Sequence, residues 1–178
     1  MILLALLLIL LTAFVLSRKF QLPRNIWLLF IAQPLIMCSA PIIVFIGGIL
    51  SSQMTANPSF ATLPISLMIL GVSAGVIPAA MIAKKKGRKF AVFSGFTCLI
   101  TASLLAMVSA ITASFELFTL ASFFIGIGGA FIQQLRFAAI ESTTNDEDIP
   151  KTLAILMLSG VFAAFLGPEI AVVAKDWL

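Results

Sequence analysis

Long apolar runs separated by short polar loops are the feature that most constrains the fold of this 178-residue chain. A helix that crosses the hydrocarbon core of a bilayer needs about 20 apolar residues, with a range of roughly 17–25. Five runs reach this length: Ile26–Leu50, Ala61–Ala83, Phe90–Ile111, Phe115–Phe137 and Thr152–Ala174. Only 10% of the residues are charged, against about 25% in an average soluble domain. We therefore expect an all-α, polytopic membrane helix bundle whose apolar side chains face lipid.

A sixth apolar run, Ile2–Leu16, is shorter than the others. No charged residue precedes it, and Ser17-Arg18-Lys19 follows it in place of the small residues of a cleavage site, which argues against a cleaved signal peptide. We expect an uncleaved short span whose amino end faces out, with an interfacial helix or a wrongly assigned start as the alternatives. With the basic linker that follows, it forms a separate N-terminal segment, residues 1–25.

Basic residues are concentrated in the loops on one side of the expected spans. The segment Lys84-Lys85-Lys86-Gly87-Arg88-Lys89 alone carries five positive charges between two apolar runs. If the five spans alternate in direction, ten of the eleven Lys and Arg residues fall on that side, and only Lys175 falls on the other. Because the loops rich in Lys and Arg stay in the cytoplasm, we expect a multi-pass protein of the plasma or inner membrane with its basic loops cytoplasmic.

The composition disfavours several kinds of chemistry. The chain has no histidine, and its two cysteines fall within expected spans, so neither a metal centre nor another cofactor is expected. Serines within the spans have no histidine, lysine or aspartate partner to activate them, so an enzyme is not expected either. The basic residues only flank the spans, which indicates membrane topology and the lipid bilayer as partner, with no nucleic acid. No phosphate-binding Gly-x-x-x-x-Gly-Lys-Ser/Thr motif is present, so ATP is not expected as an energy source.

Small residues recur at helical spacing within three of the spans. Small side chains let the backbones of two membrane helices approach closely. The positions expected to serve this packing are Gly71, Gly75, Gly126, Gly128, Gly160, Gly167 and Pro168. Generic packing surfaces are the simplest interpretation of most of them, although glycine and proline also allow helices to bend.

The basic segment resembles a motif of the major facilitator superfamily of transporters. In that family the loop between helices two and three reads approximately Gly-x-Leu-Ala-Asp-Arg-x-Gly-Arg-Arg/Lys, and Ala80–Lys89 follows the same spacing. The matching residues are Lys85, Gly87, Arg88 and Lys89. Ala80 stands where the family has glycine, and Lys84 stands where it has aspartate. The family's aspartate is implicated in closing the cytoplasmic side, so this gating role is not expected of Lys84.

Two further segments are more loosely similar to the same family. Ser122–Gly128 resembles the fourth-helix pattern Arg-x-x-x-Gly-x-Gly, with Ser122 in place of the arginine. The segment from Gly160 to Gly167-Pro168 resembles the fifth-helix Gly-Pro motif. The resemblance implies that residues 26–178 are helices one to five of a twelve-helix transporter, an amino-terminal half that is apparently truncated.

This resemblance implies secondary-active transport of an unidentified small solute by alternating access. The chain is then a fragment of a longer permease, the product of a broken gene, or a half that pairs with a missing second half. A non-transporting integral membrane protein or an inactive remnant of a permease is the alternative function.

Polar residues within the spans are candidates for the solute path, because such groups are costly in lipid and usually face a neighbouring helix or a cavity. The candidates are Gln33, Gln133, Gln134 and Arg136. An interhelical hydrogen bond explains Gln33 nearly as well, and Arg136 alone is equally consistent with a side chain that reaches the lipid headgroups. Glu169 is the candidate for proton coupling if it faces inward; otherwise it is a solvated carboxylate at the membrane boundary.

Overall fold

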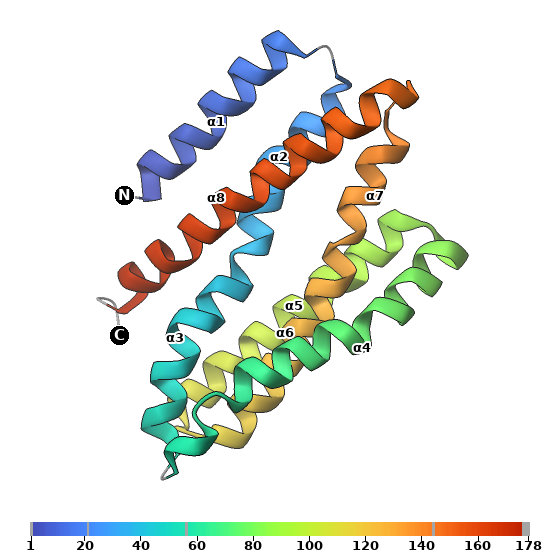
Figure 1. Cartoon of the computed structure of the whole chain (residues 1–178). Helices are drawn as coiled ribbons and strands as arrows, with labels where there is room; N and C mark the ends of the chain where they lie inside the picture. Colours follow the sequence, from blue (N-terminus) through green and yellow to red (C-terminus); the bar gives the residue numbers. More distant parts are fainter. Residues whose placement is uncertain (1, 21, 56, 144, 176–178) are drawn as a thin grey trace. The chain divides into compact units, whose positions relative to one another are not determined.

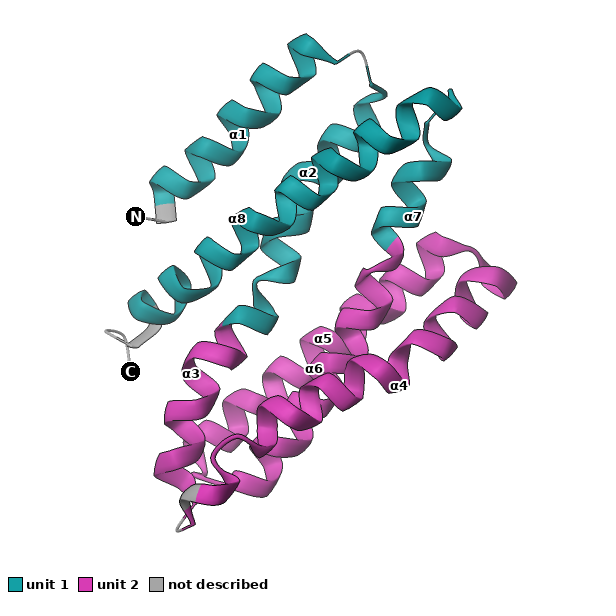
Figure 2. Cartoon of the chain, in the orientation of Figure 1, with its two compact units in different colours: residues 1–41, 135–178 teal, residues 42–134 magenta. Residues whose placement is uncertain are grey.

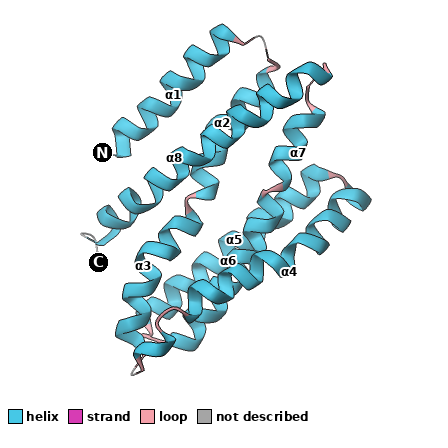
Figure 3. Cartoon of the chain, in the orientation of Figure 1, coloured by secondary structure: helices cyan, strands magenta, loops and turns pink. Residues whose placement is uncertain are grey.

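The computed structural model describes residues 2–20, 22–55, 57–143 and 145–175. These residues form eight α-helices and two short 3-10 helices, and no strand occurs among them (Figure 1, Figure 3). In chain order the elements are α1 (Ile2–Lys19), α2 (Arg24–Met37), α3 (Ser39–Met54), η1 (Pro58–Phe60), α4 (Leu63–Lys86), α5 (Arg88–Ile111), α6 (Phe115–Ile132), α7 (Gln134–Glu141), η2 (Asp146–Asp148) and α8 (Ile149–Lys175).

Five helical segments are long and apolar enough to cross a membrane. They are Arg24–Met54, Leu63–Lys86, Arg88–Ile111, Phe115–Glu141 and Asp146–Val173. Each coincides with one of the predicted spans, and α1 is not among the five. Large apolar side chains are exposed along them, for example Ile77 at 69% and Phe93 at 63%. The prediction of an all-α, multi-pass membrane bundle is therefore confirmed, because only lipid can solvate such surfaces.

Two of the predicted spans are not continuous helices. The first is interrupted at Cys38, between α2 and α3. Pro41 explains this interruption, because its nitrogen carries no hydrogen to donate to the Met37 carbonyl and its ring crowds that carbonyl. The fourth span is interrupted at Gln133, whose N–H still donates to the Gly129 carbonyl oxygen (3.1 Å).

The chain forms two compact units (Figure 2). Unit 1 comprises Met1–Pro41 and Leu135–Leu178, and unit 2 comprises Ile42–Gln134. This grouping follows contacts in space, and the expected sequence boundary after residue 25 stays a prediction.

Unit 2 is built on the close pairing of α4 with α6. A Cβ atom placed on Gly71 of α4 would overlap the carbonyl oxygen of Phe123, and one on Gly126 of α6 would overlap the carbonyl oxygen of Met68. The two backbones are therefore in direct contact, which only glycine permits. Helix α5 also packs closely against α6, but there the nearest atom to a Cβ on Gly128 belongs to a side chain, Cγ of Leu99 at 2.7 Å.

Unit 1 contains α2 and α8, with α1 packed against both. The side of α1 that packs is narrow, since Ile9 and Ala13 are buried while Leu3, Leu7 and other apolar residues of α1 are exposed. A T-shaped contact between the rings of Phe30 and Phe162, with centroids 6.2 Å apart, joins α2 to α8. The α2–α8 pair therefore packs through large side chains, in contrast to the glycine contacts of unit 2.

Candidate functional site

A cavity of about 540 Å³, wide open on one side, lies in unit 1, and its lining residues Met157 and Val161 are exposed. Its lining residues come from α2, α3, α7 and α8: Met37, Pro41, Arg136, Met157, Gly160, Val161, Ala163 and Ala164. The volume falls in the range of roughly 300–1,000 Å³ that is usual for small-molecule sites, which are mostly apolar with a few polar groups. The cavity thus has the size and the chemistry of a solute site.

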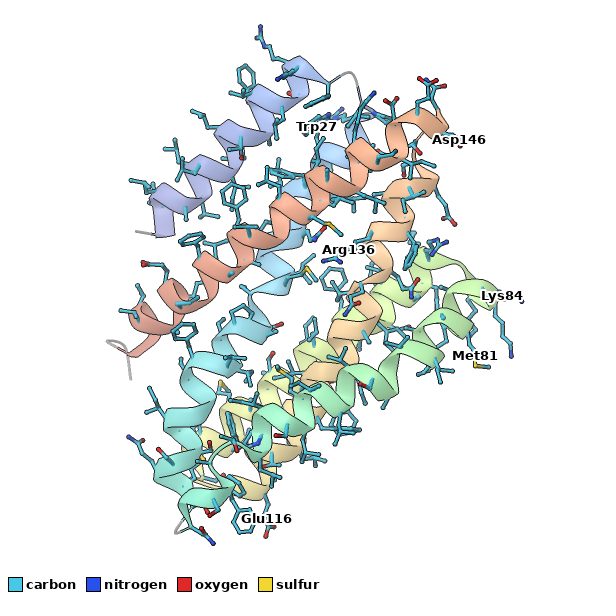
Figure 4. All side chains as sticks on the ribbon, in the orientation of Figure 1. Trp27, Met81, Lys84, Glu116, Arg136 and Asp146 are labelled. Atoms are coloured by element: carbon cyan, nitrogen blue, oxygen red, sulfur yellow. The ribbon has the colours of Figure 1, made fainter. Side chains whose placement is uncertain are left out.

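Arg136 is the charged residue of this cavity. It lies in the first turn of α7, on the side of that helix toward α2 and α8 (Figure 4). Its Nε is buried and has no hydrogen-bond partner among the described residues. A guanidinium group presents five N–H donors and no acceptor, so this side chain is suited to bind an anion or a carbonyl oxygen.

Gln33 lies behind the wall of the same cavity. Its side chain is 1% exposed, and its Nε2 donates to the Leu156 carbonyl oxygen of α8 (3.1 Å). The same Nε2 lies 3.4 Å from the sulfur of Met37, which lines the cavity. Its Oε1 is buried and has no partner among the described residues. Gln33 therefore combines the interhelical hydrogen bond considered from the sequence with an unsatisfied acceptor close to the cavity.

A second hydrogen bond between α2 and α8 forms at a carbonyl oxygen that Pro34 leaves without its helical partner. A proline cannot donate to the carbonyl four residues earlier, so the Phe30 carbonyl oxygen loses its usual helical partner. The hydroxyl of Ser159, on α8, donates to that oxygen at 3.0 Å. Ser159 is fully buried, so the hydrogen bond satisfies both groups in a setting where an unpaired group is costly.

Gly167 and Gly160 of α8 differ in their surroundings. A Cβ on Gly167 would overlap Cβ of Pro41 and lie 3.3 Å from the Cys38 carbonyl oxygen, so α8 is in close contact with the α2–α3 interruption. Pro168 follows within α8. No described atom lies within 4 Å of a Cβ placed on Gly160, which lines the cavity. No contact in the described part of the chain supports the packing role expected of Gly160, which stays a prediction.

Gln133 and Gln134 do not line the cavity. Gln133 is the C-terminal cap of α6. Gln134 is buried in unit 2, where its Oε1 accepts a hydrogen bond from Nη1 of Arg88 (3.3 Å). This contact ties the start of α5 to the end of α6, a connection that the sequence did not indicate. Of the four predicted path residues, the structure thus brings Arg136 into the cavity and Gln33 next to it.

The basic segment forms the tight connection between α4 and α5. Lys84, Lys85 and Lys86 end α4, where positive charge is favourable next to the partially negative C-terminus of a helix. Gly87 alone separates the two helices and has a φ of +87°, a conformation that residues with a Cβ rarely adopt. Nζ of Lys86 lies 4.7 Å from the centre of the Phe90 ring. The predicted Gly87 therefore makes the turn, and Lys85 and Lys89 are exposed beside it.

Glu169 lies on α8 outside the set of cavity-lining residues. It is five residues beyond Ala164, which at 3.6 residues per turn rotates its side chain by about 140° away from the cavity face of the helix. The side chain is partly buried. The role of Glu169 in proton coupling stays a prediction. Such a role would not involve direct contact with a solute in this cavity.

Comparisons with known proteins identify the family. The riboflavin transporter RfnT of Brucella anthropi is 33% identical over 153 residues, 86% of this chain and 38% of that protein. The MFS-type transporters YdeG and YfiU of Bacillus subtilis are 25% and 31% identical over 75% and 74% of this chain. No protein-family model and no solved structure matches the chain. The chain spans 26–38% of the length of these three relatives. Because the similarity to these transporters extends over 74–86% of the chain, the chain belongs to the major facilitator superfamily of transporters.

Proposed function

We propose that this chain forms part of a secondary-active transporter, which moves a small organic solute across the cell membrane by alternating access. The observation that carries the proposal is the cavity of unit 1, where one guanidinium group faces apolar side chains from three other helices. In transporters of this kind, solute sites lie near the middle of the membrane and often adjoin discontinuous helices. Both α2–α3 and α6–α7 are interrupted helices, and Met37, Pro41 and Arg136 lie within three residues of the interruptions.

We extend the proposal to the orientation of the chain in the membrane and to its assembly with the rest of the transporter. The connections that contain Lys84 to Lys89 and η2 face the cytoplasm, as the excess of basic residues favours. The remainder of the transporter, which corresponds to the larger part of each relative, completes the solute pathway as a further segment or a partner chain. The chain carries out transport and no enzymatic reaction.

Riboflavin is our first candidate for the solute. One relative is named as its transporter. The isoalloxazine ring of riboflavin is large, flat and mostly apolar, and it carries two carbonyl oxygens that can accept from a guanidinium group. Methionine, valine and alanine side chains on α8 and α2 provide a matching apolar wall. Arg136 would then orient the ring through its carbonyl edge.

A riboflavin titration tests the site directly. The chain is placed in nanodiscs, and quenching of riboflavin fluorescence is followed as protein is added. We expect saturable quenching, and we expect Arg136→Gln to weaken it about tenfold or more, because a hydrogen bond to a charged group contributes about 1.5–3 kcal/mol. Arg24→Gln is the matched control, since Arg24 is an exposed arginine of the same unit. Equal binding by the Arg136 and Arg24 variants would contradict the proposed site.

Transport itself requires a cellular test, because the chain covers only part of its relatives. Bacteria that cannot synthesise riboflavin are grown on limiting riboflavin while they express the chain, alone or with the carboxyl-terminal part of a relative. Growth that depends on Arg136 supports transport. Binding without growth in either case supports the alternative, a non-transporting integral membrane protein.

A further inference from the structure

The amide oxygen of Gln33 is a buried hydrogen-bond acceptor without a partner among the described residues. Gln33 is 1% exposed, so water does not solvate its side chain freely. Its Oε1 has no hydrogen-bond partner among the described residues. A buried acceptor left unpaired costs about 1–3 kcal/mol, so proteins rarely retain one without a use.

The orientation of this amide is fixed by its other contact. Nε2 faces the Leu156 carbonyl oxygen at 3.1 Å, and a carbonyl can only accept. Exchanging the oxygen and the nitrogen would place two acceptors against each other, so rotating the amide cannot relieve the unpaired oxygen. Oε1 therefore remains an acceptor that requires a donor from outside this pair of residues.

Met37 connects the amide group of Gln33 to the cavity. Its sulfur is 3.4 Å from Nε2 of Gln33, and the residue is part of the cavity wall. A thioether is a weak acceptor, and the unbranched methionine side chain changes rotamer easily. A small movement of Met37 would extend the cavity to the amide of Gln33 at little energetic cost.

We propose that Arg136 and Gln33 bind the solute together, Arg136 as hydrogen-bond donor and Oε1 of Gln33 as acceptor. A rotamer change of Met37 gives the solute access to Gln33. This inference rests on the proposed function, in which the cavity is the solute site. Arg136 can only donate and Oε1 can only accept, so the pair selects solutes that carry both a carbonyl oxygen and an N–H group on an apolar ring. Cyclic imides and lactams have this pattern. The inference therefore assigns a substrate class and a second binding residue.

The test compares two probes in which methyl groups replace the hydrogens of the N–H groups, with the Gln33→Met variant as the control for the added methyl volume. Quinazoline-2,4-dione has two carbonyl oxygens and two N–H groups, and its 1,3-dimethyl derivative retains only the carbonyl oxygens. Binding to the chain in nanodiscs is measured by calorimetry. We expect the dimethyl compound to bind about tenfold more weakly, because one missing partner leaves a buried acceptor unpaired. Gln33→Met, which is nearly isosteric, should reduce binding of the dione to the level of its dimethyl derivative.

The melting temperature distinguishes a solute-binding role of Gln33 from a purely structural role. Gln33→Met removes the unpaired oxygen, which is favourable, and also the hydrogen bond from Nε2 to the Leu156 carbonyl oxygen, which is unfavourable. If Oε1 binds a solute, these effects nearly cancel, and the melting temperature of the solute-free chain should stay within about 2 °C. Ser159→Ala is the control at the same helix pair: it should lower the melting temperature and leave the preference between the probes unchanged. Met37→Ala should bind the dione at least as tightly as the unchanged chain.

Three results would overturn the inference. They are equal binding of the two probes, no saturable binding of the dione, and a Gln33→Met variant that loses stability but binds the dione normally. The last result would mean that Gln33 only joins α2 to α8. The proposed function is judged separately by the Arg136→Gln titration, so either proposal can fail while the other holds.

Discussion

The contact between α4 and α6 gives the sharpest prediction for stability, through the substitution Gly126→Ala. A Cβ at this position would overlap the Met68 carbonyl oxygen and lie 2.9 Å from both the Met68 carbonyl carbon and the Val72 nitrogen. Ordinary van der Waals contact of a Cβ begins at about 3.4 Å. All three atoms belong to the backbone of α4, so no side chain can turn away to make room.

The cost follows from that geometry. The overlap with the Met68 oxygen is the tightest of the three, so the two helices must separate by about an ångström along their contact. A gap of this size forfeits up to about half of the attraction between facing atoms. Overpacking of this kind costs about 1–3 kcal/mol. Alanine is the better helix former by about 1 kcal/mol, which offsets part of that cost. Because only backbone atoms are in the way, the overpacking cost lies at the upper end of its range, and we expect a net loss of about 2 kcal/mol, or a melting temperature lower by about 4–8 °C.

Cys98 offers a reporter for this measurement. It lies on α5 and is partly buried, with its sulfur 3.4 Å from the Phe124 carbonyl oxygen of α6, so the reaction rate of its thiol should rise when unit 2 opens. In a Cys38→Ala background it is the single thiol of the chain. Reaction with a fluorogenic maleimide during heating in mild detergent then gives the melting temperature of unit 2.

Gly129→Ala is the matched control for Gly126→Ala. Gly129 is on the same helix, but no described atom lies within 4 Å of a Cβ placed there. This variant gains helix propensity without a clash, so its melting temperature should be unchanged or slightly higher. Equal melting temperatures for the two variants would refute the claim that backbone contact at Gly126 holds α4 and α6 together.

Three further predictions follow from the other contacts. Ser159→Ala should destabilise the chain by about 1 kcal/mol, and Pro34→Ala should reverse most of this loss, because residue 34 then donates to the Phe30 carbonyl oxygen; a thermal double-mutant cycle measures the coupling. With a membrane-impermeant maleimide, a cysteine at Asn57 should label in intact cells and one at Asp146 only after the cells are permeabilised; labelling of both in intact cells would contradict the five-span layout. Glu169→Gln should leave solute binding unchanged but abolish the pH dependence of uptake in proteoliposomes; uptake with the same pH dependence in both proteins would remove the coupling role.

The sequence predicts the spans well because their signal is local. Each run is longer than a soluble helix and is bounded by charges or turn residues, so a window of about 20 residues contains the information. The interruptions at Cys38 and Gln133 are not evident from the sequence. Pro41 lies within an apolar run, and the same residue would bend a helix mildly or interrupt it, depending on how neighbours satisfy the freed carbonyl.

The candidate site is predicted only in part, because its residues are distant in the sequence. Arg136 stands out as a charge within a span, and it does line the cavity. Gln134 looks equivalent two residues earlier, yet it pairs with Arg88, since successive residues of a helix point to different sides. The partners of Gln33 and Phe30 are more than 120 residues away, and no periodicity within α2 or α8 indicates which side chain reaches which carbonyl.

The two main helix pairs also differ in how they can respond to a solute. In unit 2, Gly71 and Gly126 place backbone directly against backbone, so any displacement of α4 from α6 loses packing that nothing replaces. In unit 1, α2 and α8 are joined by the side chains of Gln33 and Ser159, each donating to a carbonyl of the other helix. Side-chain hydrogen bonds can be exchanged for bonds to a solute, and Met37 can change rotamer beside them. The pair that borders the cavity is therefore the one whose contacts can rearrange when a solute binds.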